Sequence, residues 1–414
     1  MLMIPEIEKR IKAVQAGRIP AGYKRAKVGI VPKEWDVFSL KNISTELHET
    51  AGNGRYETLS ISAGVGFVNQ TSKFGKDISG AQYAKYTVLK KGDFSYNKGN
   101  SKKYPQGCVY QLKDREEAVV PNVFESFRLI NGENDFFEQL FINGFLNGQL
   151  FSKINHGVRD DGLLNLRGDD FYSCQVPFPP IGEQKKIAEI LATQDKVIEL
   201  RENLIAEKQS QKKYLMSVLL GDDFKKPFKL NGVTIDKKKW EKKKLGEIAT
   251  LKTGSLPQSI NNVGPYYYVN AGCENSGYTD SFNCEGNVIT TPSRGQGGIG
   301  EVFYQEKPFW LGPLSYKIMV LKDISVKYVF YAMLFYKRKI KDEMKTGSIP
   351  AVNAGDLEKI KYNLPTLPEQ KAIADVLSAA DEEISLLQKD LEQEKLKKKS
   401  LMQLLLTGLV RVKV

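Results

Sequence analysis

The feature that most constrains the fold of this chain is a pair of long helical segments that repeat 186 residues apart. One is predicted over 183–220 and the other over 369–406, and neither contains an internal proline or glycine. EQKKIAEIL, which opens the first segment, matches EQKAIADVL in the second, and KYLMSVLL, which closes the first, matches KSLMQLLL. Agreement at both ends of two segments this long indicates an internal duplication.

Both segments carry helix-start signals and an apolar seam. Each follows a proline-rich approach, VPFPPIGEQ or NLPTLPEQ, and has a glutamate in its first turn, where the helix dipole favours negative charge. In the second segment, the positions that step by four and three from Ile373 to Leu405 are apolar in eight cases of ten. This period predicts a coiled-coil seam rather than a helix confined to one compact domain.

The two helices are expected to pair with each other in antiparallel orientation. Gly221-Asp222 stops the first helix, and the following domain lets the chain return before the second begins. Such pairing would relate the two halves by a pseudo-twofold axis. It would also bring Lys208 and Lys212, which interrupt the first seam, near the acidic cluster at 381–383.

The duplication extends upstream into the parts that precede each helix. Trp35, Leu40 and Ile43 recur with the same spacing as Trp240, Leu245 and Ile248, and Gly168-Asp169 recurs as Gly355-Asp356. We therefore predict an α+β fold with two similar mixed α/β domains, each followed by a long helix.

The predicted boundaries follow from this repeat and from the length, because 414 residues exceed one ordinary globular core. The expected parts are a first domain at 1–182, a spacer helix at 183–221, a second domain at 222–368 and a C-terminal helix region at 369–414. Five of the twelve excess positive charges lie in a basic linker at 222–244, which holds nine lysines and four acidic residues. A solvated face and a phosphate-contacting surface both remain open for this linker.

Composition excludes several classes of protein. With 41% hydrophobic and 27% charged residues, the chain is expected to be neither disordered nor a membrane protein, and the N-terminus lacks a signal-peptide pattern. A cytoplasmic location is therefore expected. Four cysteines, two histidines and the absence of CxxC spacing predict reduced cysteines and no zinc module.

Four sequence segments resemble a known family. They are GYKRAKVGIVPKEWDVFSLKNI at 22–43, the two helix starts with their EQK motif, and PSRGQGGIGEVF at 292–303. In these segments, and in its order of domain, helix, domain and helix, the chain resembles the specificity subunit of type I restriction-modification enzymes. The resemblance covers essentially the whole chain.

This resemblance implies a non-catalytic DNA-recognition subunit. Each domain would be a target-recognition domain that reads one half of a bipartite, asymmetric site in double-stranded DNA. The helices would set the spacing between the half-sites and dock two modification (methyltransferase) subunits, which restriction subunits would join. S-adenosylmethionine, ATP and magnesium would be used by these partner subunits, and no cofactor is expected in this chain.

The chain also contains a literal GxGxxG, but its context does not favour a cofactor site. Gly295, Gly297 and Gly300 are followed by EVFYQEKPF, which predicts a strand, whereas a dinucleotide site needs a helix there. Glycines around Arg294 instead suit a turn that approaches DNA, where arginine can contact guanine with two hydrogen bonds. A plain turn with a solvent-facing arginine is the alternative.

Polar loops supply the candidate DNA-binding residues, which are predicted from residue type and position alone. In the first domain the richest loop combines amides, lysines and an aromatic ring, with a mobile surface loop as the alternative. Its members are Tyr96, Asn97, Lys98, Asn100, Lys102 and Lys103. The other candidates are Arg159, Lys252, Thr253, Ser293, Arg294, Gln296 and Lys345, with Ser255, Asn270 and Asn275 as further possible members.

The helix starts supply the candidates for partner contact. These are Gln184, Ile187, Leu191, Gln370, Ile373 and Leu377. Two other functions remain as alternatives: a self-contained restriction-modification enzyme, which the lack of methyltransferase, Walker and nuclease motifs disfavours, and a coiled-coil protein scaffold that does not read DNA.

Overall fold

The computed structural model describes residues 5–76, 79–99, 104–154, 164–222, 224, 226–272, 276–295, 298–344 and 350–413. The chain divides into two compact units. Unit 1 contains Met1–Leu200 and Leu391–Val414, and unit 2 contains Arg201–Asp390. No helix among the described residues is long and apolar enough to cross a membrane.

The two predicted helices are present, and each begins two residues earlier than expected. They are α7 (Ile181–Leu220) and α12 (Leu367–Leu406). Within unit 1 the start of α7 packs against the end of α12, and within unit 2 the end of α7 packs against the start of α12. The predicted antiparallel pairing is therefore confirmed.

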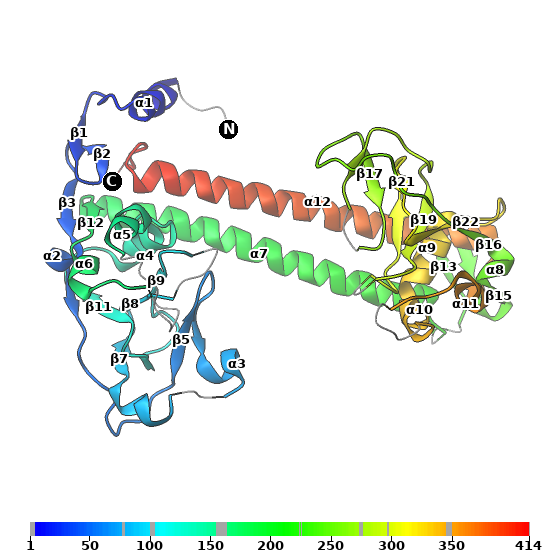
Figure 1. Ribbon diagram of the computed structural model, residues 1–414, viewed down its shortest axis with the longest axis horizontal. Helices are drawn as coiled ribbons and strands as arrows, with labels where there is room; N and C mark the ends of the chain where they lie inside the picture. Colours follow the sequence, from blue (N-terminus) through cyan, green and yellow to red (C-terminus); the bar gives the residue numbers. More distant parts are fainter. Residues whose placement is uncertain are drawn as a thin grey trace. The chain divides into compact units, whose positions relative to one another are not determined.

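Unit 1 is built around a four-stranded antiparallel sheet with the order β4-β11-β8-β9. Helix α4 covers this sheet (Figure 1). Its phenylalanines join the start of α7 and the end of α12 in one core. The elements are α1 (Pro5–Gln15), β1 (Tyr23–Ala26), β2 (Gly29–Pro32), β3 (Asp36–Ser39), α2 (Leu40–Ile43), β4 (Ser44–Glu46), β5 (Leu59–Ser62), β6 (Gly66–Asn69), α3 (Gln70–Phe74), the 3-10 helix Gly80–Lys85, β7 (Thr87–Lys90), β8 (Phe94–Asn97), β9 (Cys108–Gln111), β10 (Glu117–Val120), β11 (Glu125–Leu129), α4 (Asn134–Ile142), α5 (Asn147–Lys153), α6 (Gly168–Tyr172) and β12 (Gln175–Phe178).

Unit 2 repeats this plan with a four-stranded sheet of order β16-β22-β19-β20 and with α9 in the place of α4. It adds a three-stranded sheet, β18-β17-β21. The elements are β13 (Phe228–Leu230), β14 (Val233–Ile235), the 3-10 helix Lys237–Lys239, β15 (Glu241–Lys244), α8 (Leu245–Ile248), β16 (Ala249–Thr253), β17 (Tyr266–Val269), β18 (Tyr278–Thr279), β19 (Val288–Pro292), β20 (Phe303–Gln305), β21 (Trp310–Leu311), β22 (Ser315–Val320), α9 (Val326–Phe335), α10 (Lys337–Asp342), α11 (Ala354–Lys359) and β23 (Lys361–Leu364).

The predicted upstream repetition is also confirmed by the topology. In each unit a hairpin, β1–β2 or β13–β14, precedes a strand that pairs antiparallel with the last strand before the long helix. These pairs are β3–β12 and β15–β23, and we call each of them the closing strand pair of its unit. A four-residue helix, α2 or α8, follows the first strand of each and buries its leucine and isoleucine.

The start of each long helix is fixed to its own unit by the same contacts. The indole of Trp35 donates to Glu183 at 3.3 Å, and the indole of Trp240 donates to Glu369 at 3.1 Å. Arg411, in the C-terminal tail, donates to Glu183 from Nε at 2.8 Å. The glutamates that the sequence places in the first helical turn are therefore buried acceptors rather than exposed charges.

Candidate nucleic-acid interface

The loop between β8 and β9 contains the predicted DNA-binding residues of unit 1. Tyr96, at its start, is fully buried, and its ring stacks on Phe171 with centroids 4.7 Å apart. Its hydroxyl donates to the Gln106 carbonyl at 2.7 Å. Tyr96 therefore anchors the two ends of this loop in the core, and in this conformation its ring is not available to a base.

The next two candidates also use their polar groups within the unit. Asn97 accepts from the Gly99 N–H at 2.8 Å and donates to the Ile61 carbonyl at 3.3 Å. Lys98 is ion-paired with Glu125, and its side chain is only 16% exposed. These contacts shape the loop. The remaining candidates of this loop, Asn100, Lys102 and Lys103, lie outside the described residues.

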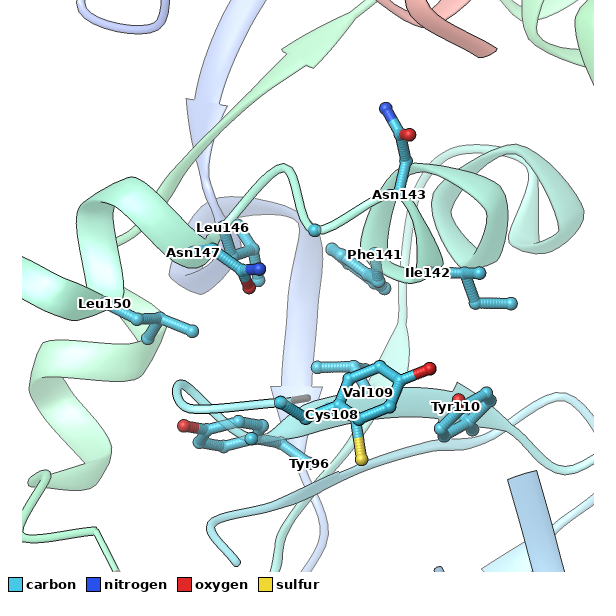
Figure 2. Close-up of a pocket in the computed structure, with 13 residues that line it drawn as sticks. Tyr96, Cys108, Val109, Tyr110, Phe141, Ile142, Asn143, Leu146, Asn147 and Leu150 are labelled. Atoms are coloured by element: carbon cyan, nitrogen blue, oxygen red, sulfur yellow. The ribbon is translucent and has the colours of Figure 1, made fainter. Parts of the chain in front are cut away.

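A small cavity lies beside this loop (Figure 2). Its volume is about 130 Å³, and Tyr96, Cys108 and Tyr110 line the strand side while Asn147 faces them from α5. Burial raises the pKa of the Cys108 thiol to about 11, so this cysteine is a neutral thiol near pH 7 rather than a nucleophile. The described residues contain no cluster of His, Cys, Asp or Glu suited to a metal ion.

In unit 2 the corresponding loop lies between β19 and β20. Arg294 is exposed, and no described carboxylate forms an ion pair with it. Its neighbour Ser293 is buried, and its backbone is held by the Leu314 carbonyl and the Val352 N–H. Gly295 has a φ of +125°, which L-residues rarely adopt, and its N–H donates to the Pro350 carbonyl at 3.1 Å. Hydrogen bonds therefore hold the backbone at Ser293 and Gly295, on both sides of Arg294, while the Arg294 side chain is exposed. Gln296 is not among the described residues.

The segment that follows this loop shows that the glycine motif is not followed by the helix of a cofactor site. It forms strand β20, antiparallel to β19, instead of a helix. Gly295 and Gly300 thus lie in a hairpin connection, as the sequence predicted, and the described segment after them is not the helix that a dinucleotide-binding turn requires.

The two candidate loops occupy the same position in the two units. Each connects the third and fourth strands of its four-stranded sheet, β8 to β9 and β19 to β20. Each is also joined by the segment that leads into α6 or α11, because Leu164 donates to the Lys98 carbonyl and Val352 to the Ser293 carbonyl. The loops share position and supporting contacts but not sequence.

The other candidates of unit 2 lie at the same end of the sheet as Arg294. Thr253, at the end of β16, pairs with Tyr316 of β22, and Tyr316 pairs on its other side with Thr291 of β19. Lys252 and Thr253 are exposed. The structure therefore brings together candidates that are 40 residues apart in the chain. Asn270 differs, because its side chain accepts from the Leu314 N–H at 3.0 Å within the unit.

Four candidates remain to be placed. The Trp310 indole donates to the Ser255 carbonyl at 2.8 Å, close to Thr253. Arg159, Lys345 and Asn275 lie outside the described residues. The chain resumes after the first two at Leu164 and Pro350, beside the loops between β8 and β9 and between β19 and β20.

The six candidates for partner contact have a different role within the chain. Gln184 accepts from the Glu133 N–H at 2.8 Å, and Gln370 accepts from the Ser325 N–H, also at 2.8 Å. These amides thereby fix α4 and α9 to the long helices. All six side chains are at most 2% exposed, including those of Ile187, Leu191, Ile373 and Leu377. Their contact with a partner subunit remains a prediction, whereas the structure shows them docking each globular part on its helix.

A charged junction joins the globular part of each unit to both long helices. In unit 2, Asp381 on α12 is ion-paired with Lys212 on α7 and accepts from the Tyr331 hydroxyl at 2.7 Å. Lys208 pairs with Glu383 at 2.6 Å. The predicted proximity of these two lysines to the acidic cluster is therefore confirmed.

Unit 1 repeats this junction with equivalent residues. Asp195 on α7 pairs with Lys398 on α12 at 2.5 Å and accepts from Gln139 of α4 at 3.0 Å. Asp195 and Lys398 are the repeat equivalents of Asp381 and Lys212 at the 186-residue offset. The sequence alone did not identify Gln139 and Tyr331, because they come from helices outside the seam.

Two copies of one fold, each with a hairpin connection at the same place in its sheet and each packed on the paired long helices, define an internally duplicated protein. A model of the type I restriction modification DNA specificity domain matches residues 32–208 and 237–396, one match for each copy. The chain therefore belongs to this family. Membership makes it a DNA specificity subunit of a type I restriction-modification system, which is a non-catalytic component.

Individual relatives agree with this assignment. The chain is 26% identical over 437 residues to a Methanocaldococcus jannaschii protein that carries the name of the type I restriction enzyme MjaX specificity subunit, covering 94% of this chain and 97% of that protein. It is 28% identical over 289 residues to the MjaVIII specificity subunit of the same organism, covering 62% and 67%.

Solved structures share the fold. The S subunit of a type I restriction-modification system from M. genitalium superimposes with a TM-score of 0.61 at 20% identity, covering 90% of this chain and 96% of that one. A chain from a study of type I restriction-modification assembly superimposes with a TM-score of 0.56 at 13% identity, covering 92% and 99%.

Proposed function

We propose that the two units read the two halves of a bipartite, asymmetric DNA site and that the paired helices set the spacing between these halves. In this proposal residues 1–182 and 222–368 are the recognition domains, and 183–221 and 369–414 are the spacer helices. The chain acts in the cytoplasm with two methyltransferase subunits, which restriction subunits join. S-adenosylmethionine, ATP and magnesium belong to those partners.

The observation that carries the proposal is the equivalence of the two hairpin loops. A loop at the same place in two copies of one fold can present side chains to two DNA segments in the same manner. Because the loops differ in sequence, Asn97 and Lys98 in one and Ser293 and Arg294 in the other, the two segments that they read should differ. Two loops at equivalent positions that carry different side chains would therefore read an asymmetric DNA site.

Exposed leucines on the helices support the docking of two methyltransferase subunits. Leu200 on α7 is 55% exposed, and its repeat equivalent Leu386 on α12 is 58% exposed. Large apolar side chains in such positions are typical of interfaces, where they act as anchors. One anchor on each helix, related by the duplication, would give each of two identical partners the same contact.

The DNA part is tested in a complex reconstituted with methyltransferase subunits, by mapping methylated positions genome-wide. One asymmetric bipartite motif is expected. Arg294→Ala should relax one half of it only, by about 1–3 kcal/mol or roughly 5- to 150-fold, as for loss of a two-bond base contact. Lys322→Ala, an exposed residue of the same unit, is the control. Equal weakening of both halves would contradict base readout by Arg294.

The docking part is tested by the stoichiometry of the complex in native mass spectrometry. Leu200→Glu and Leu386→Glu should each lower the count from two methyltransferase subunits to one, because a buried carboxylate opposes docking. Leu321→Glu, at a half-exposed leucine in the connection between β22 and α9, should leave two bound. Two subunits bound to either helix variant would rule out these anchors.

A further inference from the structure

The closing strand pair of unit 2, β15–β23, carries an unusual arrangement of lysines. Lys244 of β15 lies directly opposite Lys361 of β23, and Lys242 lies two residues along the same strand. Directly opposite residues and residues two apart point to the same face of an antiparallel pair. Three ammonium groups therefore share one face, and all three side chains are exposed.

A fourth lysine joins this face from α10. The Lys339 ammonium donates to the Lys361 carbonyl at 3.2 Å, which fixes it beside the strands. Burial lowers the pKa of Lys339, and the charge of Lys242 lowers it further, whereas Asp222 opposes this. Asp222 accepts from Asn363 at 2.9 Å on the same pair of strands. We call Lys242, Lys244, Lys339 and Lys361 the four-lysine surface.

The fold itself does not require these charges. Like charges directly opposite each other destabilise a strand pair. In unit 1 the closing strand pair is β3–β12. It has Val37 and Ser39 at the positions of Lys242 and Lys244 in unit 2, and Gln175 at the position of Lys361. The same strand pairing thus forms in unit 1 without any of these lysines, so an anionic ligand is the simplest explanation for their grouping in unit 2.

The surroundings favour nucleic-acid phosphate over a protein ligand. Protein interfaces depend on buried apolar anchors, and none of the strongly exposed large hydrophobic residues lies on β15, β23 or α10. Phosphate contact needs only mobile positive charges at suitable spacing. No described carboxylate lies within ion-pair distance of Lys242, Lys244, Lys339 or Lys361, and Asp222 is the one acidic group whose charge acts on Lys339. Four positive charges therefore face one carboxylate on this surface.

Helix α10 also connects this surface to the candidate loop. Lys337 and Lys341 pair with Glu301, both at 3.2 Å, just before β20. Lys339, two residues from each, points to the strands instead. One short helix therefore contacts the β19–β20 connection on one side and the four-lysine surface on the other.

We propose that the four-lysine surface binds the phosphate backbone of DNA next to the half-site that unit 2 reads, without regard to base sequence. This inference rests on the proposed function. It assigns a phosphate-binding role to part of the lysine-rich stretch at 222–244 and predicts that unit 2 grips its DNA more strongly than unit 1 through backbone contacts.

The test compares Lys244→Gln/Lys361→Gln with Lys307→Gln/Lys322→Gln in the complex reconstituted with methyltransferase subunits. Lys307 and Lys322 are exposed lysines of the same unit outside the surface. DNA binding is measured against salt concentration, on DNA with and without the methylated site. For the first variant, the slope of log K against log salt should fall by about 2, with equal weakening on both DNAs. The second variant should keep the slope.

The outcomes separate this inference from the proposed function. If the wild-type complex shows no preference for its methylated site, the proposed function fails. If it shows that preference but Lys244→Gln/Lys361→Gln keeps the wild-type slope, only the phosphate surface is refuted. Weaker assembly with methyltransferase subunits in the absence of DNA, together with an unchanged slope, would instead identify a protein-docking surface and overturn the inference.

Folding of the variant is checked by its melting temperature. Because the substitutions remove opposed like charges, Tm should equal or slightly exceed that of the wild type. A clear fall in Tm would show that the lysines serve the fold, which contradicts the proposal.

Discussion

The two units share one fold, but their side chains match in some regions and differ in others. At the long helices the contacts match pair by pair: tryptophan to glutamate, glutamine to a backbone N–H, and aspartate to lysine. In the hairpin loops and on the closing strand pairs, the residues of the two units differ in charge and size. The contrast separates positions that build the assembly from positions that are free to acquire a target.

The largest expected effect concerns the paired tryptophans, which are equivalent but unequally buried. Trp35 is fully buried and also contacts the C-terminal tail at Gly408, whereas Trp240 is partly exposed. Trp35→Ala should cost unit 1 about 3–5 kcal/mol, and Trp240→Ala should cost unit 2 about half as much. Hydrogen–deuterium exchange of each unit's core amides measures both. Equal losses would show that the tail adds nothing to Trp35.

A smaller effect is expected at the two charged junctions, which should behave alike. Asp381→Ala leaves Lys212 without its partner, and Asp195→Ala does the same to Lys398, whose side chains are 16% and 19% exposed. Each change should cost about 1–2 kcal/mol, because both aspartates remain partly in water. Thermal unfolding of the two variants provides the measurement.

The control for these junctions is the exposed pair of Lys196 and Glu199 on α7, both 59% exposed. Glu199→Ala should change stability by less than about 0.5 kcal/mol. The exchange Lys212→Asp/Asp381→Lys should recover part of the loss caused by Asp381→Ala. If the exchanged chain is no more stable than the single variant, the junction acts through shape rather than charge.

The smallest effect is a pH dependence in unit 2. Burial raises the pKa of Glu369, but hydrogen bonds from Asp236, Thr366 and Trp240 outweigh it and hold the pKa below its usual range. A carboxylate with a lowered folded-state pKa stabilises the fold above its unfolded pKa, and this contribution is lost as the pH falls through the folded value. Stability should therefore decline below about pH 4.3.

Glu369→Gln isolates this contribution. The variant should be less stable than wild type at neutral pH, and the difference should shrink as the solution becomes acidic. Glu382→Gln, at an exposed carboxylate of the same helix, should run parallel to wild type. A difference between Glu369→Gln and wild type that does not change with pH would contradict the assignment.

Much of the architecture could be predicted because it depends on local and periodic signals. The seam period, the proline-rich starts and the positions of Lys208 and Lys212 were enough to predict the helices, their direction and their register. Each of these signals lies in one segment and needs no knowledge of distant packing.

The candidate site was harder to predict because it depends on burial. Tyr96 lies on β8, where three of four side chains are buried, so no alternation marks which face reaches solvent. Gln184 and Gln370 stand in a pattern that suits an interface as well as a core, and only the structure shows their backbone partners. Tyr331 and Gln139 reach the junctions from helices remote in sequence.

The closing strand pairs have a consequence for how such a protein can evolve. The chain enters each globular part on one strand and leaves it on the strand alongside, so that Lys244 and Lys361 are partners about 5 Å apart although 117 residues separate them. A gene segment that encodes everything between such partners could be exchanged as a cassette. The helices and their junctions would be inherited unchanged, and a new target could arise without any redesign of the assembly.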